Sequence, residues 1–392
     1  MSSKLISHNA DLKKLRDEGY EIEIKNAHLL VRSVPYVSAR KEIAKGILVS
    51  PLGDMAGDKT TRPQDHVIHF AGDHPCDRDG NIIKGIQHST GKKMLAEGIE
   101  VDHSFSNKPE GGYADYYEKI TTYVKIIEAH AQSIDSSVSA RTFKVIESDD
   151  PDMPFHYFDT NSSRAEIEAI SAKLKNLKIA IIGLGGTGSY VLDFVAKTPV
   201  KEIHLFDGDG FLSHNAFRSP GAASLEALRA QPKKVAYLHG IYSQMRKNVI
   251  PHGDHLTEPT LNELAGMSFA FICIDESEAK KLIVEKLIAL NIPFADVGMG
   301  INAIDGLLAG SARVTTVTPE RKEHAGKRIS FSDGKDDDYD QNVQIAELNA
   351  LNAALAVIKW KKLSGFYHDL GKEYHATYDI SVNKIMNDET DV

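Results

Sequence analysis

The chain has 392 residues, of which 42% are hydrophobic and 26% are charged, so it is long enough to bury two cores and has the composition of an ordinary globular protein. Its formal net charge is −9 and it has no long Lys/Arg block, which argues against a nucleic-acid partner. It has no run of about 18 apolar residues, and its N-terminal MSSKLISHNADLKK lacks the apolar core of a signal peptide, so we expect a cytoplasmic protein with no membrane partner.

Residues 1–160 have the pattern of a small α+β domain. Short strands are predicted at three places: residues 21–34, 66–72 and 142–148. A helix is predicted at residues 114–134, where apolar side chains recur at helical spacing. The polar stretch at residues 149–154 is typical of a domain boundary.

From residue 161 onward, strand-like and helix-like segments alternate, which is typical of a mainly parallel sheet with helices on both faces. After a first helix at residues 164–174, with an N-cap at Asn161–Ser163, the expected strands are residues 178–183, 202–207, 269–275, 293–298 and 306–318. The expected helices are residues 187–197, 226–247, 277–290 and 343–363. In the last helix, one apolar face is expected to contact the core: Ile345, Leu348, Leu351, Leu355 and Ile358. We therefore predict an α/β domain at residues 161–392.

A glycine-rich turn, GLGGTGSYV (183–191), directly follows the apolar run KIAII (178–182). Gly183, Gly185 and Gly188 fit the dinucleotide pattern Gly-x-Gly-x-x-Gly, with Gly186 inside it, in which a tight turn brings phosphate to the N–H groups of a helix N-terminus. The pattern also expects an acidic residue at the end of the next strand, where Asp207 would bind the ribose hydroxyls. NAD and ATP fit these features equally well.

The next segment, DGDGFLSHNAFR (207–218), distinguishes the two nucleotides. Asp207, Asp209, Asn215 and Arg218 match, in order and spacing, the Asp-x-Asp and Asn-x-x-Arg motifs of the ThiF-like adenylyltransferases, the superfamily of the ubiquitin-activating enzymes. The Gln-Pro-Lys step at 231–233 also resembles that family. The resemblance extends from about residue 163 to residue 365 and is far more specific than the glycines alone.

The resemblance implies a Rossmann-like adenylation domain that uses ATP and Mg²⁺ to activate a carboxylate. Negative charge builds on the phosphates in that reaction, so fixed cations at Arg218 and Lys233 would stabilise its transition state. Asn215 would donate to phosphate oxygens, and Asp209 is a further nucleotide-binding candidate. Asp275, at the end of FAFICID, resembles the family's metal-site Asp and would hold Mg²⁺.

The sequence departs from the family at the metal site and at the nucleophile. Glu276 and Lys280 stand where relatives often carry Asn and Arg, and the structural Cys-x-x-Cys pairs of many relatives are absent, so no zinc is expected. No cysteine follows Cys273, which is interpreted as a core thiol.

A covalent relay on this chain would therefore need another acceptor. Cys76 is the only candidate for an exposed thiol, and Ser330 and Ser332 lie where relatives have their crossover loop, with His324 as a nearby base. Direct transfer of the adenylate to a separate acceptor protein is an equal alternative.

The N-terminal region is dense in residues that can bind metals or move protons: His66, His69, His74, Cys76, His88 and His103. We favour surface or structural histidines over a metal cluster. The region resembles an uncharacterised domain fused ahead of ThiF-like modules in bacterial ubiquitin-like conjugation operons. That resemblance implies recognition of a ubiquitin-like protein or of a conjugating enzyme.

We predict an ATP-dependent adenylyltransferase that activates the C-terminal carboxylate of a ubiquitin-like protein in a bacterial conjugation system. The resemblance implies a homodimer, and the tail of the partner is expected near Gly298–Ile301. Three alternatives remain: an NAD-dependent oxidoreductase on the same fold, a nucleotide-binding scaffold without transfer activity, and a relative that activates a peptide or an amino acid.

Overall fold

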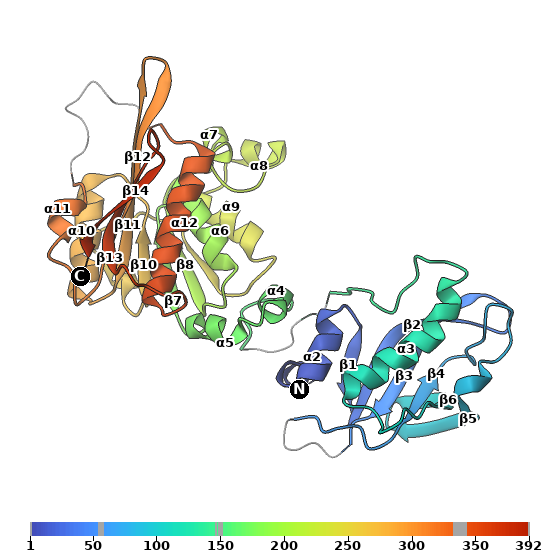
Figure 1. Cartoon of the computed structure of the whole chain (residues 1–392). Helices are drawn as coiled ribbons and strands as arrows, with labels where there is room; N and C mark the ends of the chain where they lie inside the picture. The colour runs from blue at the N-terminus through green and yellow to red at the C-terminus, as the bar shows by residue number, and fades with distance from the viewer. Residues whose placement is uncertain (1, 54–58, 146, 148–151, 332–342, 391–392) are drawn as a thin grey trace. The chain divides into compact units, whose positions relative to one another are not determined.

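The computed structural model describes residues 2–53, 59–145, 147, 152–331 and 343–390 (Figure 1). Its contacts divide the chain into two compact units, Met1–Asp150 and Pro151–Val392, and each is described by itself. We call them the N-terminal unit and the C-terminal unit.

The N-terminal unit is an antiparallel sheet packed against helices, as expected for an α+β domain. The six strands lie in the order β1 (Ile22–Lys25), β2 (His28–Val37), β3 (Ile43–Pro51), β4 (Val67–Ala71), β6 (Ile99–Ser106) and β5 (Gln87–Ala96). The helices are α1 (Ser2–His8), α2 (Ala10–Asp17), the short 3-10 turn η1 (Lys84–Ile86) and α3 (Tyr116–Gln132). Apolar side chains of α2 and α3 share one buried cluster with the sheet.

Three predictions for this unit are confirmed and one is wrong. The segment at 21–34 contains β1 and most of β2. The helix at 114–134 is α3, which begins after Asp115, whose carboxylate accepts the Glu118 N–H at 2.7 Å. The segment at 66–72 contains β4. The predicted strand at 142–148 is wrong for its described residues 142–145, which lie outside any strand; Phe143 has φ +49° and a side chain that is 64% exposed.

The C-terminal unit confirms the predicted α/β class. The eight strands lie in the order β14 (Lys384–Thr390), β13 (Glu373–Asp379), β12 (Leu307–Val317), β11 (Phe294–Ile304), β10 (Phe269–Ile272), β7 (Lys178–Ile182), β8 (Glu202–Phe206) and β9 (Val249–His252). From β11 to β9 all neighbours are parallel, whereas β12 to β14 add an antiparallel edge. The sheet is therefore mostly parallel.

Helices cover both faces of this sheet. Helices α6 (Gly186–Ala196), α9 (Lys234–Tyr242) and α12 (Ala346–Leu363) share one buried cluster with it, and α10 (Ser277–Ala289) belongs to a second cluster on the other face. Figure 1 shows α6 and α12 side by side in front of the strands. In the same view the hairpin of β11 and β12 rises beyond the sheet, because β13 pairs with β12 only at Ser311–Thr315.

Three predicted helices differ from the structure. The helix at 164–174 is broken into α4 (Thr160–Arg164), α5 (Glu168–Ser171) and a 3-10 turn, η2 (Ala172–Leu174), because Glu166 is left-handed with φ +57°. Its cap is Asp159 and not the Asn161–Ser163 run. The helix at 226–247 is α8 (Leu225–Ala230) followed by α9, since Gln231 is also left-handed and precedes a proline.

The inward face of α12 is the third difference. In its first half the buried residues are small or polar, including Asn349, Asn352 and Ala353, and further along they include Val357 and Trp360, whereas Ile358 of the predicted apolar face is 43% exposed. Small side chains at this face allow α12 to lie close against the first turn of α6. Of the predicted face, Leu355 packs against the core cluster while Ile358 is exposed, so the apolar pattern predicted the inward face only in part.

Candidate nucleotide-binding site

The glycine turn joins β7 to α6 and presents an open helix N-terminus. Gly183 has φ +87°, and a Cβ there would lie 2.7 Å from the Cys273 carbonyl oxygen. A Cβ at Gly188 would collide with the Gly183 carbonyl, so these two glycines are needed for the turn itself. A Cβ at Gly185 would meet nothing within 4 Å, so this face of the turn is open to an approaching group. The first N–H groups of α6 have no side-chain cap, which suits a phosphate.

Gly186 is needed for a different contact. A Cβ on this residue would collide with the side chain of Asn349, which comes from α12. The Thr187 hydroxyl donates to Asn349 Oδ1 at 2.9 Å, so the first turns of α6 and α12 are joined by a buried hydrogen bond. Sequence reasoning missed Asn349, because it is 162 positions from its partner and had no recognised motif.

The Asp-x-Asp motif after β8 is built around a buried lysine. Asp207 Oδ2 accepts the Leu184 N–H at 2.6 Å, which fixes the carboxylate beneath the glycine turn. Lys234 Nζ donates to Asp209 at 2.7 Å and to Asp207 at 3.3 Å, and its side chain is only 9% exposed. The hydrogen bond from Lys234 is the main cause that holds the pKa of Asp209 below its ordinary value.

Lys233, the lysine chosen from the Gln-Pro-Lys step, has different contacts. Its amine donates to the Gly253 carbonyl and lies 3.4 Å from Asp254, and its side chain is 52% exposed. Lys234 is the lysine that contacts the Asp pair. Two adjacent lysines gave the sequence no basis for choosing between them, and the start of α9 at Lys234 determines which one faces inward.

A group of polar side chains with buried, unpaired atoms follows β8. Asn215 is 1% exposed; its Oδ1 accepts the Leu212 N–H at 2.9 Å, but its Nδ2 has no partner. Arg218 Nε and Ser219 Oγ are also buried without a hydrogen-bond partner. A buried polar atom without a partner costs about 1–3 kcal/mol, so three such atoms in five residues indicate a place kept for a ligand.

The candidate metal residue stands at the end of β10. Asp275 is exposed, and the next helix, α10, begins two residues later at Ser277, whose buried hydroxyl has no hydrogen-bond partner. No group of three or more His, Cys, Asp or Glu side chains is placed to hold a metal among the described residues. A single carboxylate still fits Mg²⁺, because this ion commonly takes one or two carboxylates and completes its shell with phosphate oxygens and water.

Neither cysteine has the surroundings of an activated thiol. Cys273 lies just beyond β10, and burial raises its pKa well above the ordinary value. The expectation of an exposed thiol at Cys76 is wrong, since this residue is 1% exposed and burial raises its pKa too. Backbone bridges to Val37 and Ile82 hold Cys76 against the N-terminal sheet.

The serine candidates are placed only in part. Ser330 is exposed just after the short helix α11 (Ala325–Arg328), whereas Ser332 lies outside the described residues. His324 is 4% exposed and donates its Nε2–H to the Thr316 carbonyl at 2.9 Å, so this nitrogen faces the sheet. That arrangement does not favour His324 as a base for Ser330.

Two histidines of the N-terminal unit, His74 and His103, form a ring pair, and no group of three or more metal-binding side chains is found among the residues that the structure describes. The rings of His74 and His103 have centroids 4.7 Å apart, and both lie against Phe105. Burial, followed by the neighbouring His74, lowers the pKa of His103. His74 Nε2 is buried and has no hydrogen-bond partner.

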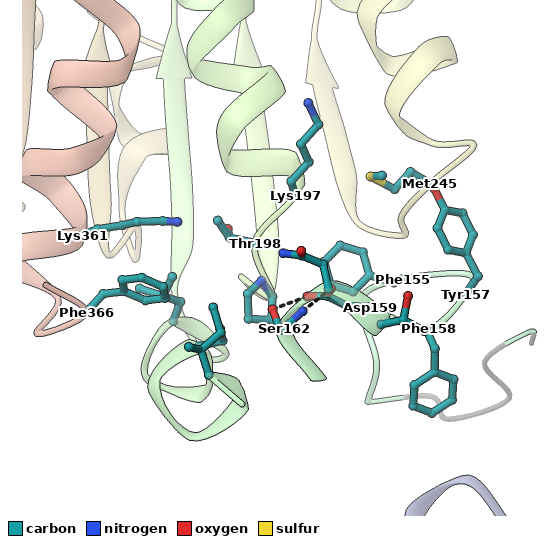
Figure 2. A pocket seen from close by; sticks show the side chains of 16 residues that line it. Phe155, Tyr157, Phe158, Asp159, Ser162, Lys197, Thr198, Met245, Lys361 and Phe366 are labelled. Atoms are coloured by element: carbon teal, nitrogen blue, oxygen red, sulfur yellow. Dashed lines mark hydrogen bonds between the residues drawn. The ribbon is translucent and has the colours of Figure 1, made fainter. Parts of the chain in front are cut away.

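A cavity of about 460 Å³ opens at the opposite end of α6 from the glycine turn (Figure 2). Its wall includes Phe155, Tyr157 and Phe366, with Lys197 and Lys361 at the ends of α6 and α12. Asp159 and Ser162 are hydrogen-bonded to each other in the wall. None of the residues matched to the nucleotide motifs lines this cavity, so we treat it as separate from the candidate site.

An open glycine turn, an acidic pair at the end of the next strand and unpaired donors beyond it define a nucleotide-binding α/β domain. The sequence matches the ThiF family over residues 160–376, and the chain belongs to that family. The resemblance to ThiF-like adenylyltransferases is thereby confirmed. Residues 10–160 match a domain of unknown function, DUF6791. Among the described residues no helix is long and apolar enough to cross a membrane.

No curated protein matched the sequence, whereas solved structures did. Escherichia coli MccB in complex with MccA-N7isoASN is 18% identical, with 56% of this chain and 66% of that chain covered and a TM-score of 0.44. The E. coli MccB complex with AMPCPP and MccA is also 18% identical, with 59% of this chain and 71% of that chain covered and a TM-score of 0.46. PaaA is 16% identical, with 59% of this chain and 80% of that chain covered and a TM-score of 0.40.

Proposed function

We propose that this protein is an ATP-dependent adenylyltransferase that activates the C-terminal carboxylate of a ubiquitin-like protein. The observation that carries the proposal is the set of unpaired buried donors that follow β8, the strand next to β7: Asn215 Nδ2, Arg218 Nε and Ser219 Oγ. Donors of this kind suit phosphate oxygens. Membership of the ThiF family favours ATP as the source of those oxygens.

The proposed reaction joins two anions. A carboxylate oxygen attacks the α-phosphorus of ATP, the bond from that phosphorus to the β-phosphate bridging oxygen breaks, and pyrophosphate leaves with the electron pair. Arg218 and Lys234, the lysine that contacts the Asp pair, stabilise negative charge on the phosphates as it builds, and Asp207 orients the ribose. Mg²⁺, held by Asp275 together with phosphate oxygens, would neutralise further negative charge.

The partners follow from the two-part chain. We assign ATP binding to the domain at 161–392, as the predicted adenylation domain, and recognition of the ubiquitin-like protein or a conjugating enzyme to the domain at 1–160. A homodimer and a bacterial conjugation pathway belong to the same proposal. Because neither cysteine is exposed and activated, the adenylate passes directly to a separate acceptor in this scheme.

The test is adenylation in a purified system. The full chain is mixed with Mg-ATP and candidate ubiquitin-like proteins, and AMP, pyrophosphate and intact mass are followed. We expect an AMP adduct on the partner's C-terminus that is lost in Arg218→Ala and reduced at least about 100-fold in Asp275→Asn, as for removal of a transition-state charge contact. Lys233→Met is the control and should retain activity, because that side chain lies at the surface.

The alternatives give different results in the same experiment. Tight binding of NAD with no AMP formed would replace the proposal by an oxidoreductase. ATP bound without AMP formation would indicate a scaffold. An AMP adduct on short peptides but on no ubiquitin-like protein would place the substrate among peptides.

A further inference from the structure

The first turns of α6 and α12 lie side by side and point in the same direction. Asn349, four residues into α12, contacts Gly186 and Thr187 at the start of α6. At the other end, Lys361 of α12 and Lys197, just after α6, line one cavity. The two helices are therefore parallel, and both N-termini meet at the edge where β7 ends (Figure 1).

Neither helix N-terminus is capped by a side chain in the part of the chain that the structure describes. The N-cap positions are Gly185 and Ile345, and neither side chain can accept a hydrogen bond. Each N-terminus carries a partial positive charge and leaves backbone N–H groups without helical partners. Two such ends together carry about one elementary positive charge, which attracts anions to the place where they meet.

Asn349 provides an independent indication of a ligand. Its side chain is fully buried, its Oδ1 accepts the Thr187 hydroxyl, and its Nδ2 has no partner. Asn352, one turn further along α12, instead donates its Nδ2 to the Gly298 carbonyl at 3.1 Å, at the point where β11 leaves the sheet. The amide of Asn349 is thus a buried donor without an acceptor, placed where the two helices begin.

Adenylation requires two such anions at once. The nucleotide phosphate and the attacking carboxylate repel each other, so binding them together needs positive charge or donors on both. One helix N-terminus is assigned to the phosphates by the glycine turn. The other, with the Asn349 amide, is available for the second anion.

We propose that the paired N-termini of α6 and α12, with Asn349 between them, form an acyl subsite that holds the substrate carboxylate beside the α-phosphate. This inference rests on the proposed function and adds a residue and a location to it. The Asn349 Nδ2–H donates to the carboxylate oxygen that becomes the carbonyl oxygen of the adenylate. The Asn352 contact to Gly298 fixes the strand from which the substrate tail approaches.

The test compares two ligands that differ only in the acyl part. AMP probes the nucleotide site alone, and glycyl-sulfamoyl adenosine, a stable mimic of an acyl adenylate, probes both sites. Calorimetry on the full chain gives the ratio of the two affinities. In Asn349→Leu we expect that ratio to fall about tenfold, the effect of one hydrogen bond to a reacting oxygen, with AMP affinity unchanged.

Thr187→Val is the matched control, because it also removes the Thr187–Asn349 hydrogen bond but leaves the Asn349 amide in place. It should keep the wild-type ratio. If Asn349→Leu does not fold, Asn349→Ala gives the same comparison, since it removes the donor without adding a charge. An unchanged ratio in a folded Asn349 variant, or an equal loss in Thr187→Val, would overturn the acyl subsite.

The same measurements separate a failure of the adenylation proposal from a failure of the acyl subsite. If the wild-type protein binds neither AMP nor the mimic and forms no AMP from ATP, the adenylation proposal itself is wrong. If it binds AMP and forms adenylate while the affinity ratio is insensitive to Asn349, only the subsite is wrong.

Discussion

The two units differ in how they treat buried polar side chains. Among the described residues, the N-terminal unit has one buried side-chain nitrogen or oxygen without a hydrogen-bond partner, His74 Nε2, whereas the C-terminal unit has ten. Of the ten, Asn349 contacts Gly186 of the glycine turn, and Asn215 and Arg218 follow β8, the strand next to β7. Among the described residues, the N-terminal unit thus pairs nearly all of its buried polar atoms, whereas the C-terminal unit leaves several unpaired, as is typical of a unit that binds a ligand.

Two of the buried lysines, one from each unit, show the same contrast. Lys119 of α3 is 1% exposed and donates to the Asp65 carbonyl at 2.8 Å, so its charge has only a neutral acceptor. Lys234 of α9 is 7% exposed and lies between two carboxylates. The buried ammonium of Lys119 destabilises the fold locally, because a neutral carbonyl does not compensate its desolvation. The ammonium of Lys234 instead holds Asp207 and Asp209 in place.

The largest effect is expected from Lys234→Met. Removing the amine leaves Asp207 buried without its cation, and breaking a buried ion pair from one side costs about 3–5 kcal/mol. Trp360, the single tryptophan of the chain, is buried in the C-terminal unit and reports its urea unfolding by fluorescence. We expect a lower free energy of unfolding and the loss of ATP binding in this variant.

Lys233→Met is the neighbouring comparison. Its amine is at the surface, where an ion pair contributes about 0–1 kcal/mol. Equal effects of the two substitutions on stability and ATP binding would show that the Asp pair does not depend on Lys234.

The candidate site could be predicted from the sequence only where its residues are local. The glycine turn and the Asp-x-Asp motif fall within 27 consecutive positions, from Gly183 to Asp209, and the residue types in these motifs indicate nucleotide binding. Asn349 comes from the last long helix, and no spacing rule connects it to Thr187. Lys234 was missed for a different reason, since the direction of each side chain in the Lys-Lys pair depends on where α9 begins.

The fold shows the same dependence on regular patterns. The parallel strands are buried on both faces and give continuous apolar runs such as KIAII, which the sequence predicts well. Strand β5 is exposed along most of its length and pairs irregularly with β6, so it has neither alternation nor an apolar run. The first part of the inward face of α12 is set by its close contact with α6 at Asn349, which favours small residues over the apolar pattern.

The next largest effect is a change with pH in the free energy of unfolding of the N-terminal unit, caused by Lys119. Burial lowers the pKa of Lys119 to about 8 from its ordinary value of 10.5, so between these values the unfolded chain binds more protons than the folded one. The free energy of unfolding of the N-terminal unit should therefore rise with pH in this window, by roughly 3 kcal/mol at most. Below about pH 8 this contribution is lost.

Lys119→Met isolates that contribution from the other groups that titrate at high pH. Urea unfolding of the full chain, followed by hydrogen exchange in α3, is compared between wild type and variant from pH 7 to about pH 10.5. We expect the difference between the two to change with pH in favour of the wild type. A difference that stays constant would mean that the Lys119 amine is not desolvated.

The smallest effect compares one serine from each unit. Ser219 Oγ in the C-terminal unit is buried without a partner, so Ser219→Ala removes an unsatisfied group and should leave the ligand-free protein as stable as the wild type or about 1 kcal/mol more stable. Ser104 Oγ in the N-terminal unit lies 2.6 Å from Ser89 Oγ and 3.0 Å from His88 Nδ1, so Ser104→Ala should destabilise its unit by about 1 kcal/mol. Trp360 fluorescence follows the first variant and hydrogen exchange in α3 the second. We expect the two changes in the free energy of unfolding to have opposite signs, because a hydroxyl kept free for a ligand contributes nothing to stability until the ligand binds. Destabilisation by both variants would show that Ser219 is paired in the folded protein.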